Sequence, residues 1–114
     1  MRSDSRDIPI DDSGSSKRYF QQIASLAERL AKKRLSIYEH RFHYLAFGSW
    51  EIVAGTRERQ LNFNYDGKDS YLMYRDASVK PRGPDDFKHH TFKTWKGEDP
   101  LAFIAEVLER EFTD

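Results

Sequence analysis

Residues 36–79 read SIYEHRFHYLAFGSWEIVAGTRERQLNFNYDGKDSYLMYRDASV, and this stretch decides the fold. Apolar residues, many of them aromatic, alternate along it with polar ones, which is the two-residue period of a strand with one buried face. Turn residues interrupt the alternation at Gly48-Ser49 and at Asp66-Gly67, and both dipeptides suit tight hairpins. The first turn sets Phe47 opposite Trp50. The pattern therefore predicts antiparallel β-structure built from consecutive hairpins.

Two loop lengths are compatible with the hairpin around Asp66-Gly67. A two-residue loop sets Leu61 opposite Leu72, whereas a four-residue loop over residues 66–69 shifts the pairing by two positions. Either loop leaves the same side chains facing inward: Leu61, Phe63, Tyr65, Leu72 and Tyr74.

The apolar positions change parity near Gly55. They are even before it and odd after it: Trp50, Ile52 and Ala54, then Leu61, Phe63 and Tyr65. In one unbroken strand these two sets would point to opposite faces of the sheet, so the chain must change its course between them. A bulge at Gly55 and a turn over residues 56–59 would both achieve this, and the sequence leaves the two open.

Two segments with helical periodicity flank this block. In the first, apolar residues at steps of three and four predict a buried stripe on a helix that ends near Arg34. The stripe consists of Phe20, Ile23, Ala24, Ala27, Leu30 and Ala31, with Tyr19 and Leu26 at its margins.

The final helix has a clear start, because Asp99 is a good N-cap and Pro100 fits the first helical position. Its core stripe consists of Leu101, Ile104, Ala105, Leu108 and Phe112. Residues 89–95 are predicted as a last strand before it. The order of elements predicts an α+β fold, an antiparallel β-meander of four to five strands flanked by an N-terminal and a C-terminal helix. We expect residues 1–15, rich in Ser, Asp and Arg, to be a disordered tail and residues 16–114 to be a single domain.

The composition is that of a small folded domain. Aromatic residues make up 14% of the 114 residues, which argues against disorder, and the absence of Cys excludes disulfides and thiolate metal sites. The N-terminal segment has no apolar run typical of a signal peptide, and no stretch has the apolar length needed to span a bilayer. We therefore expect a cytoplasmic, bacterial protein without a membrane partner.

The net charge is zero but unevenly distributed. Residues 17–47 hold seven Lys or Arg against two Asp or Glu, and residues 98–114 hold one against six. A basic first helix and an acidic last helix can attract each other within one molecule or between two copies.

No pattern of residues indicates catalysis or metal binding. His40 and His43 are three positions apart in a predicted strand, so their side chains point to opposite faces, and the neighbours His89 and His90 diverge in the same way. Neither a Gly-x-Ser-x-Gly turn nor a phosphate-binding glycine pattern occurs. We therefore assign no catalytic residue, no metal ligand and no cofactor, and we keep an unrecognised small enzyme as an alternative.

The favoured function is a non-enzymatic interaction module that binds itself or another protein. The reason is the composition of the second face of the sheet. In an antiparallel sheet, a face exposed to solvent usually carries polar residues. Four apolar residues are instead expected on it: Trp50, Ile52, Tyr71 and Met73.

Binding of single-stranded nucleic acid is the alternative from another class. Exposed aromatic side chains can stack on bases, and cations beside them can follow the phosphates. The candidate contacts are Arg41, His43, Tyr44, Lys88, Lys93 and Trp95.

Overall fold

The computed structural model describes residues 15–43, 48–78, 80, 82–83, 86–93 and 98–112, and it places them in two helices and one five-stranded sheet. In chain order the elements are α1 (Ser15–Ala31), β1 (Ser36–His43), β2 (Ser49–Gly55), β3 (Gln60–Asp66), β4 (Tyr71–Asp76), β5 (Lys88–Thr91) and α2 (Pro100–Glu111). The strands lie side by side in this order, and each neighbouring pair is antiparallel. The predicted α+β meander with a helix at each end is confirmed. The tail expected over residues 1–15 lies outside the described residues, except for Ser15.

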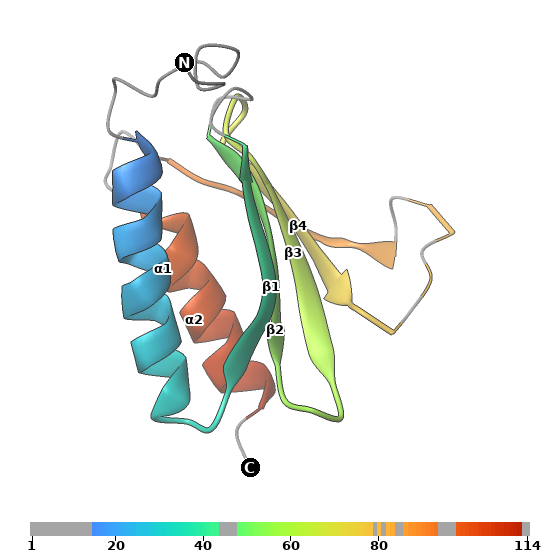
Figure 1. The fold of residues 1–114 in the computed structure, drawn as a ribbon. Helices are drawn as coiled ribbons and strands as arrows, with labels where there is room; N and C mark the ends of the chain where they lie inside the picture. The colour runs from blue at the N-terminus through green and yellow to red at the C-terminus, as the bar shows by residue number, and fades with distance from the viewer. Residues whose placement is uncertain are drawn as a thin grey trace, which may run out of the picture.

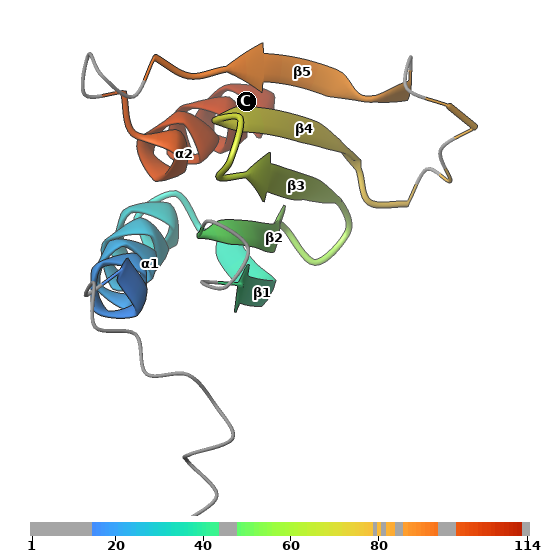
Figure 2. The same ribbon diagram turned by 90° about the horizontal axis from the view of Figure 1, so that it is seen from above.

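Both helices cover the same face of the sheet (Figure 1), and from above they form one layer beside the strands (Figure 2). They run in the same direction along this face (Figure 1), α1 in contact with β1 and α2 in contact with β3. No described element lies over the opposite face. We call the two sides of the sheet the helix face and the open face.

The change of parity between β2 and β3 is achieved by a turn. The strands end on either side of residues 56–59, where the backbone N–H of Thr56 donates to the carbonyl of Arg59 at 2.8 Å. The register pairs Ile52 with Phe63. Even-numbered side chains of β2 and odd-numbered side chains of β3 therefore share the helix face, and of the two alternatives the turn is the correct one.

Both registers predicted for the next hairpin were wrong. The loop between β3 and β4 spans residues 67–70, so Leu72 pairs with Tyr65 and not with Leu61. The Asp66 carboxylate stabilises this longer loop by accepting a hydrogen bond from one of its backbone N–H groups at 2.9 Å. Because a shift by an even number of residues keeps each side chain on its face, the predicted inward set is still correct.

The register of the first hairpin also differs from the prediction. Trp50 pairs with Phe42, with residues 44–48 between the strands, and the predicted partner Phe47 lies outside the described residues. Tyr19 of α1 stacks on Phe42 with ring centroids 4.3 Å apart, so this register also brings α1 onto the sheet.

The buried stripe of α1 is turned by about one position from the predicted one. Tyr19, Leu26 and Leu30 have exposed fractions of 3%, 4% and 0%, although the first two were expected at the margins. Most of the predicted stripe is exposed instead: Phe20, Ala24, Ala27 and Ala31. One residue corresponds to a rotation of about 100°, and in the observed orientation Tyr19 faces β1 while Arg29 reaches α2.

A bidentate ion pair joins the two helices near their C-terminal ends. The guanidinium group of Arg29 donates to both carboxylate oxygens of Glu109, each at 2.8 Å. These hydrogen bonds, and the positive charge of Arg29, lower the pKa of Glu109. The opposite charges expected for the first and last helices thus meet here within one molecule.

We expect Arg29→Gln to raise the pKa of Glu109 toward that of a free glutamate. Because the folded-state pKa lies below the unfolded-state pKa, the pair stabilises the fold above the unfolded-state value, and this contribution is lost as the pH falls through the folded-state pKa. Both side chains are partly exposed, so the contribution should be about 0.2–1 kcal/mol. An NMR titration of the side-chain carboxyl carbons measures the shift. An unchanged titration of Glu109 in the variant would contradict this account of the pair.

Candidate functional site

Two large hydrophobic side chains are exposed among the described residues, and they lie near the same edge of the sheet. Phe20 of α1 is 54% exposed, and Tyr38 of β1 is 45% exposed. Ala24 and Ala27 are exposed too, and they extend the apolar surface along α1 because steps of three and four stay on one side of a helix. We call Phe20, Ala24, Ala27 and Tyr38, together with the outer edge of β1, the β1 edge surface.

This flank of α1 is opposite the one that faces α2. The flank toward α2 is polar and consists of Arg18, Gln22, Ser25 and Arg29. Phe20 instead lies beside β1, where its ring meets the ring of His40 edge to face at a centroid distance of 6.3 Å. The hydroxyl of Tyr19 lies 3.3 Å from Nδ1 of His40, and burial raises the pKa of Tyr19 to about 12.

β1 forms one edge of the sheet and pairs with β2 along its other side. A register shift between Ile37 and Glu39 leaves Tyr38 as the extra residue of a bulge. From Glu39 to His43 the pairing with β2 is regular. Glu39 and Arg41 are both exposed and alternate with the residues of the helix face, so they lie on the open face at this edge.

The surface expected from Trp50, Ile52, Tyr71 and Met73 is divided between the two faces. Trp50 and Ile52 are 6% and 0% exposed beneath the helices, so the expectation that they contact a partner is corrected. The physical reason is the turn over residues 56–59, which places the even-numbered residues of β2 on the helix face. Tyr71 and Met73 do lie on the open face, and both are half-buried.

The open face has a polar centre. Asn62 is 7% exposed and donates to the Glu51 carboxylate at 3.0 Å, and Asn64 in turn donates to Asn62. The Tyr71 hydroxyl and Nδ1 of His89 form a hydrogen bond, and their rings stack. Such mutually satisfied polar groups are typical of a solvated sheet face.

The candidate nucleic-acid contacts that the structure describes do not form one patch. Arg41 and His43 lie on β1 and Lys88 lies on β5, at opposite edges of the sheet, four strand spacings or about 19 Å apart. Lys88 pairs with a residue of the helix face, whereas Arg41 belongs to the open face. The remaining candidates are Lys93, exposed just after β5, and Tyr44 and Trp95, which lie outside the described residues.

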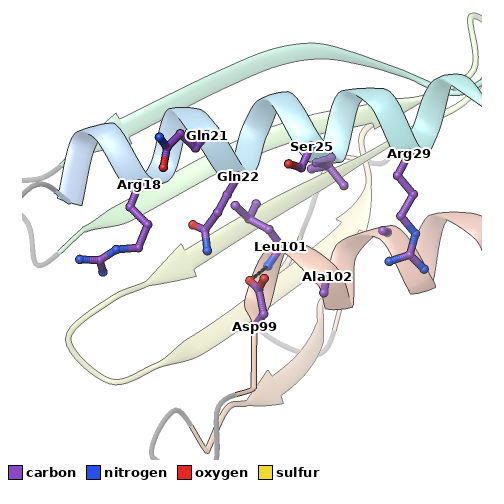
Figure 3. Close-up of a pocket in the computed structure, with 10 residues that line it drawn as sticks. Arg18, Gln21, Gln22, Ser25, Arg29, Asp99, Leu101 and Ala102 are labelled. Atoms are coloured by element: carbon purple, nitrogen blue, oxygen red, sulfur yellow. Dashed lines mark hydrogen bonds between the residues drawn. The ribbon is translucent and has the colours of Figure 1, made fainter.

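A groove of about 310 Å³ lies between α1 and α2 (Figure 3). Its floor is made of small and aliphatic side chains from both helices: Leu26, Leu101, Ala102 and Ala105. The Asp99 carboxylate at its rim accepts a hydrogen bond from the N–H of Leu101 at 2.9 Å, and Arg29 is engaged with Glu109. Asp99 and Arg29 are therefore engaged within the protein, and Arg18 is the further charged residue that lines the groove.

The four histidines are distributed over both faces. His40 and His90 share the helix face, and His43 and His89 share the open face, as their spacing predicted. His90 stacks on Phe103 with ring centroids 4.4 Å apart, which is a packing contact. Within the described ranges, no three His, Asp or Glu side chains are arranged to hold a metal ion.

The predictions from the sequence did not include the β1 edge surface. The available signal was the width of the apolar arc on α1, where residues 19, 23, 26 and 30 form one stripe and residues 20, 24, 27 and 31 form a second beside it. A helix that packs on a sheet through one side buries about one such stripe, so a second stripe indicates a surface for something else.

No helix formed by the described residues has the length and apolar character required to cross a bilayer. Comparison of the chain with protein-family models, with curated proteins and with solved structures found no match.

Proposed function

We propose that the protein is a non-enzymatic interaction module that self-associates through the β1 edge surface. The observation that supports this most directly is the exposure of Phe20 and Tyr38 beside an edge strand. Apolar side chains that are exposed together, rather than singly, are typical of protein-binding surfaces. The strand edge adds backbone donors and acceptors with which a second chain can pair.

The shape of the surface suits a protein partner. Phe20 would be the anchor, because aromatic side chains dominate interface energies and burying an exposed Phe stabilises by about 1.5–3 kcal/mol. Ala24 and Ala27 have small side chains, so a second helix can approach α1 closely.

A second copy of the chain is the simplest partner. A two-fold axis lets one surface serve both molecules, so a single set of exposed residues is sufficient. The net charge of zero means that two copies do not repel each other as wholes.

We expect the protein to be a dimer at concentrations of about 100 µM and to dissociate on dilution, as measured by sedimentation velocity. Ala24→Glu places a charge within the apolar contact and should raise the dimer Kd by about tenfold or more. Ser25→Glu is the matched control, because it adds the same charge one residue along, on the flank that faces α2. This control should leave the Kd unchanged.

A protein that stays monomeric over the whole concentration range would contradict the proposal, and so would equal effects of the two glutamates. Circular dichroism melting curves at low concentration check that both variants keep the fold. Fluorescence polarisation with a single-stranded oligonucleotide tests the rival function. Binding by the monomer with a steep salt dependence would favour nucleic acid as the partner.

A further inference from the structure

We infer that two copies pair β1 with β1 in an antiparallel register centred on His40, so that their sheets join into one continuous sheet. The inference rests on the proposed function, because it specifies how the second copy binds the β1 edge surface. It follows from the strand edge, from the charges on the open face and from the position of Phe20 on the helix face.

β1 is the edge better suited to such pairing. It has eight residues, whereas β5 at the other edge has four. The bulge at Tyr38 interrupts the strand on one side and leaves the regular stretch of residues 39–43. Two such stretches can align antiparallel through the backbone N–H and C=O groups that point away from β2.

Geometry limits the registers that two copies of this stretch can adopt. Two residues that lie opposite each other in the paired strands must have side chains on the same face of the sheet. Their backbone N–H and C=O groups that point away from β2 must also align. The two residue numbers must therefore both be odd or both be even. The two-fold axis therefore passes between the two copies of one central residue, which pairs with itself. Within residues 39–43, the centres that pair at least three residues of each copy are His40, Arg41 and Phe42.

Charge selects among these centres. A centre at Arg41 sets two guanidinium groups opposite each other. A centre at Phe42 sets Arg41 against His43. The centre at His40 sets Glu39 opposite Arg41, and by symmetry it does so twice. Because opposite charges attract across antiparallel strands and like charges repel, the register centred on His40 is favoured.

The position of Phe20 on the helix face supports the same centre. The rings of Phe20 and His40 are 6.3 Å apart, so Phe20 lies near an axis that passes between the two copies of His40. The two α1 helices then lie antiparallel beside the axis, with Phe20 and Ala24 between them. This arrangement covers Phe20, the more exposed of the two large hydrophobic side chains, and Tyr38 in the bulge lies just beyond the paired residues 39–41.

A charge exchange tests the register. Glu39→Arg and Arg41→Glu each set like charges opposite each other twice, and each should raise the dimer Kd by about tenfold or more. The double variant restores both attractions, so its Kd should return to within about threefold of the wild-type value. The control exchange uses exposed neighbours in the turn over residues 56–59, Arg57→Glu and Glu58→Arg, which should leave the Kd unchanged singly and together.

The outcomes separate this inference from the proposed function. A dimer that Ala24→Glu dissociates, but that the single reversals at positions 39 and 41 leave intact, would overturn the register and retain self-association. A double variant that is as weak as the single variants would overturn the register as well. A monomeric wild-type protein would instead overturn the proposed function itself.

Single cysteines provide a second measurement, because the chain contains no Cys. In the proposed register position 40 faces itself, and opposite residues in antiparallel strands lie within the Cα separation that a disulfide spans. With oxidised glutathione as the oxidant, His40→Cys should form an intermolecular disulfide. Glu39→Cys and Arg41→Cys each face a different residue and should cross-link several-fold more slowly. Faster cross-linking at position 39 or 41 than at position 40 would overturn the inference.

Discussion

Phe63→Ala should lower the free energy of unfolding by about 3–5 kcal/mol, an effect large enough to threaten the fold. Phe63 is fully buried on β3, the central strand, where its ring stacks on Tyr74 at a centroid distance of 5.3 Å. Its cross-strand neighbour Ile52 is also fully buried. Because these neighbours are held by β2 and β4, they cannot collapse into the space that the ring leaves. Urea unfolding followed by circular dichroism measures the loss.

The same substitution at Phe20 is the control for this result. Phe20 is 54% exposed, so Phe20→Ala should change the stability of the monomer by about 0.5 kcal/mol or less. The unfolding is measured at a concentration low enough to keep the protein monomeric, since the same change should weaken self-association. Equal losses of stability in the two variants would mean that core and surface are wrongly assigned.

Gly55→Ala should destabilise the protein by about 2–4 kcal/mol, because both the backbone conformation and the space at this position require glycine. The φ angle of Gly55 is +152°, in the range that residues with a side chain rarely adopt. An added Cβ would lie 2.5 Å from the carbonyl oxygen of Arg59 and 2.9 Å from the Cα of Gln60. Both atoms belong to the backbone of the β2–β3 turn and its first paired residue, so the clash is relieved only by moving the turn.

Gly83→Ala is the matched control for the glycine. A Cβ at Gly83 would meet nothing within 4 Å, so the change should alter the melting temperature little and should not lower the stability by more than about 0.5 kcal/mol. Thermal unfolding of both variants under the same conditions gives the comparison. If Gly55→Ala leaves the stability unchanged, the turn can shift freely. The turn would then not explain why even-numbered residues of β2 and odd-numbered residues of β3 lie on the same face.

The local patterns of the chain determined which elements form and in what order. The alternation over residues 36–79 indicates strands because it collects apolar side chains on one face. Asp99 and Pro100 mark the start of α2, and in the structure the Asp99 side chain accepts from the N–H of Leu101 with Pro100 in the first turn. These signals arise from interactions between residues that are close together in the chain, so the sequence alone is sufficient to predict the elements.

The registers of the hairpins depend on more than the turn residues. Asp66-Gly67 does lie at the reversal between β3 and β4, yet pairing starts between Asp66 and Tyr71. The carbonyl of Ser70 in this loop accepts a hydrogen bond from the N–H of Phe92, which follows β5. The loop length is therefore decided partly by a segment about twenty residues further along the chain, which the turn dipeptide does not encode.

Only the tertiary structure decided which side of α1 is buried. The helix carries two adjacent apolar stripes, one with Tyr19 and Leu26 and one with Phe20 and Ala24, and periodicity alone does not rank them because both repeat at helical steps. The helix turns the first stripe inward, where Tyr19 stacks on Phe42 and Arg29 pairs with the last helix. Those partners are distant from α1 in the sequence, so they come next to it only when the sheet and α2 pack together. The second stripe remains outside for the same reason, and the proposed function depends on it.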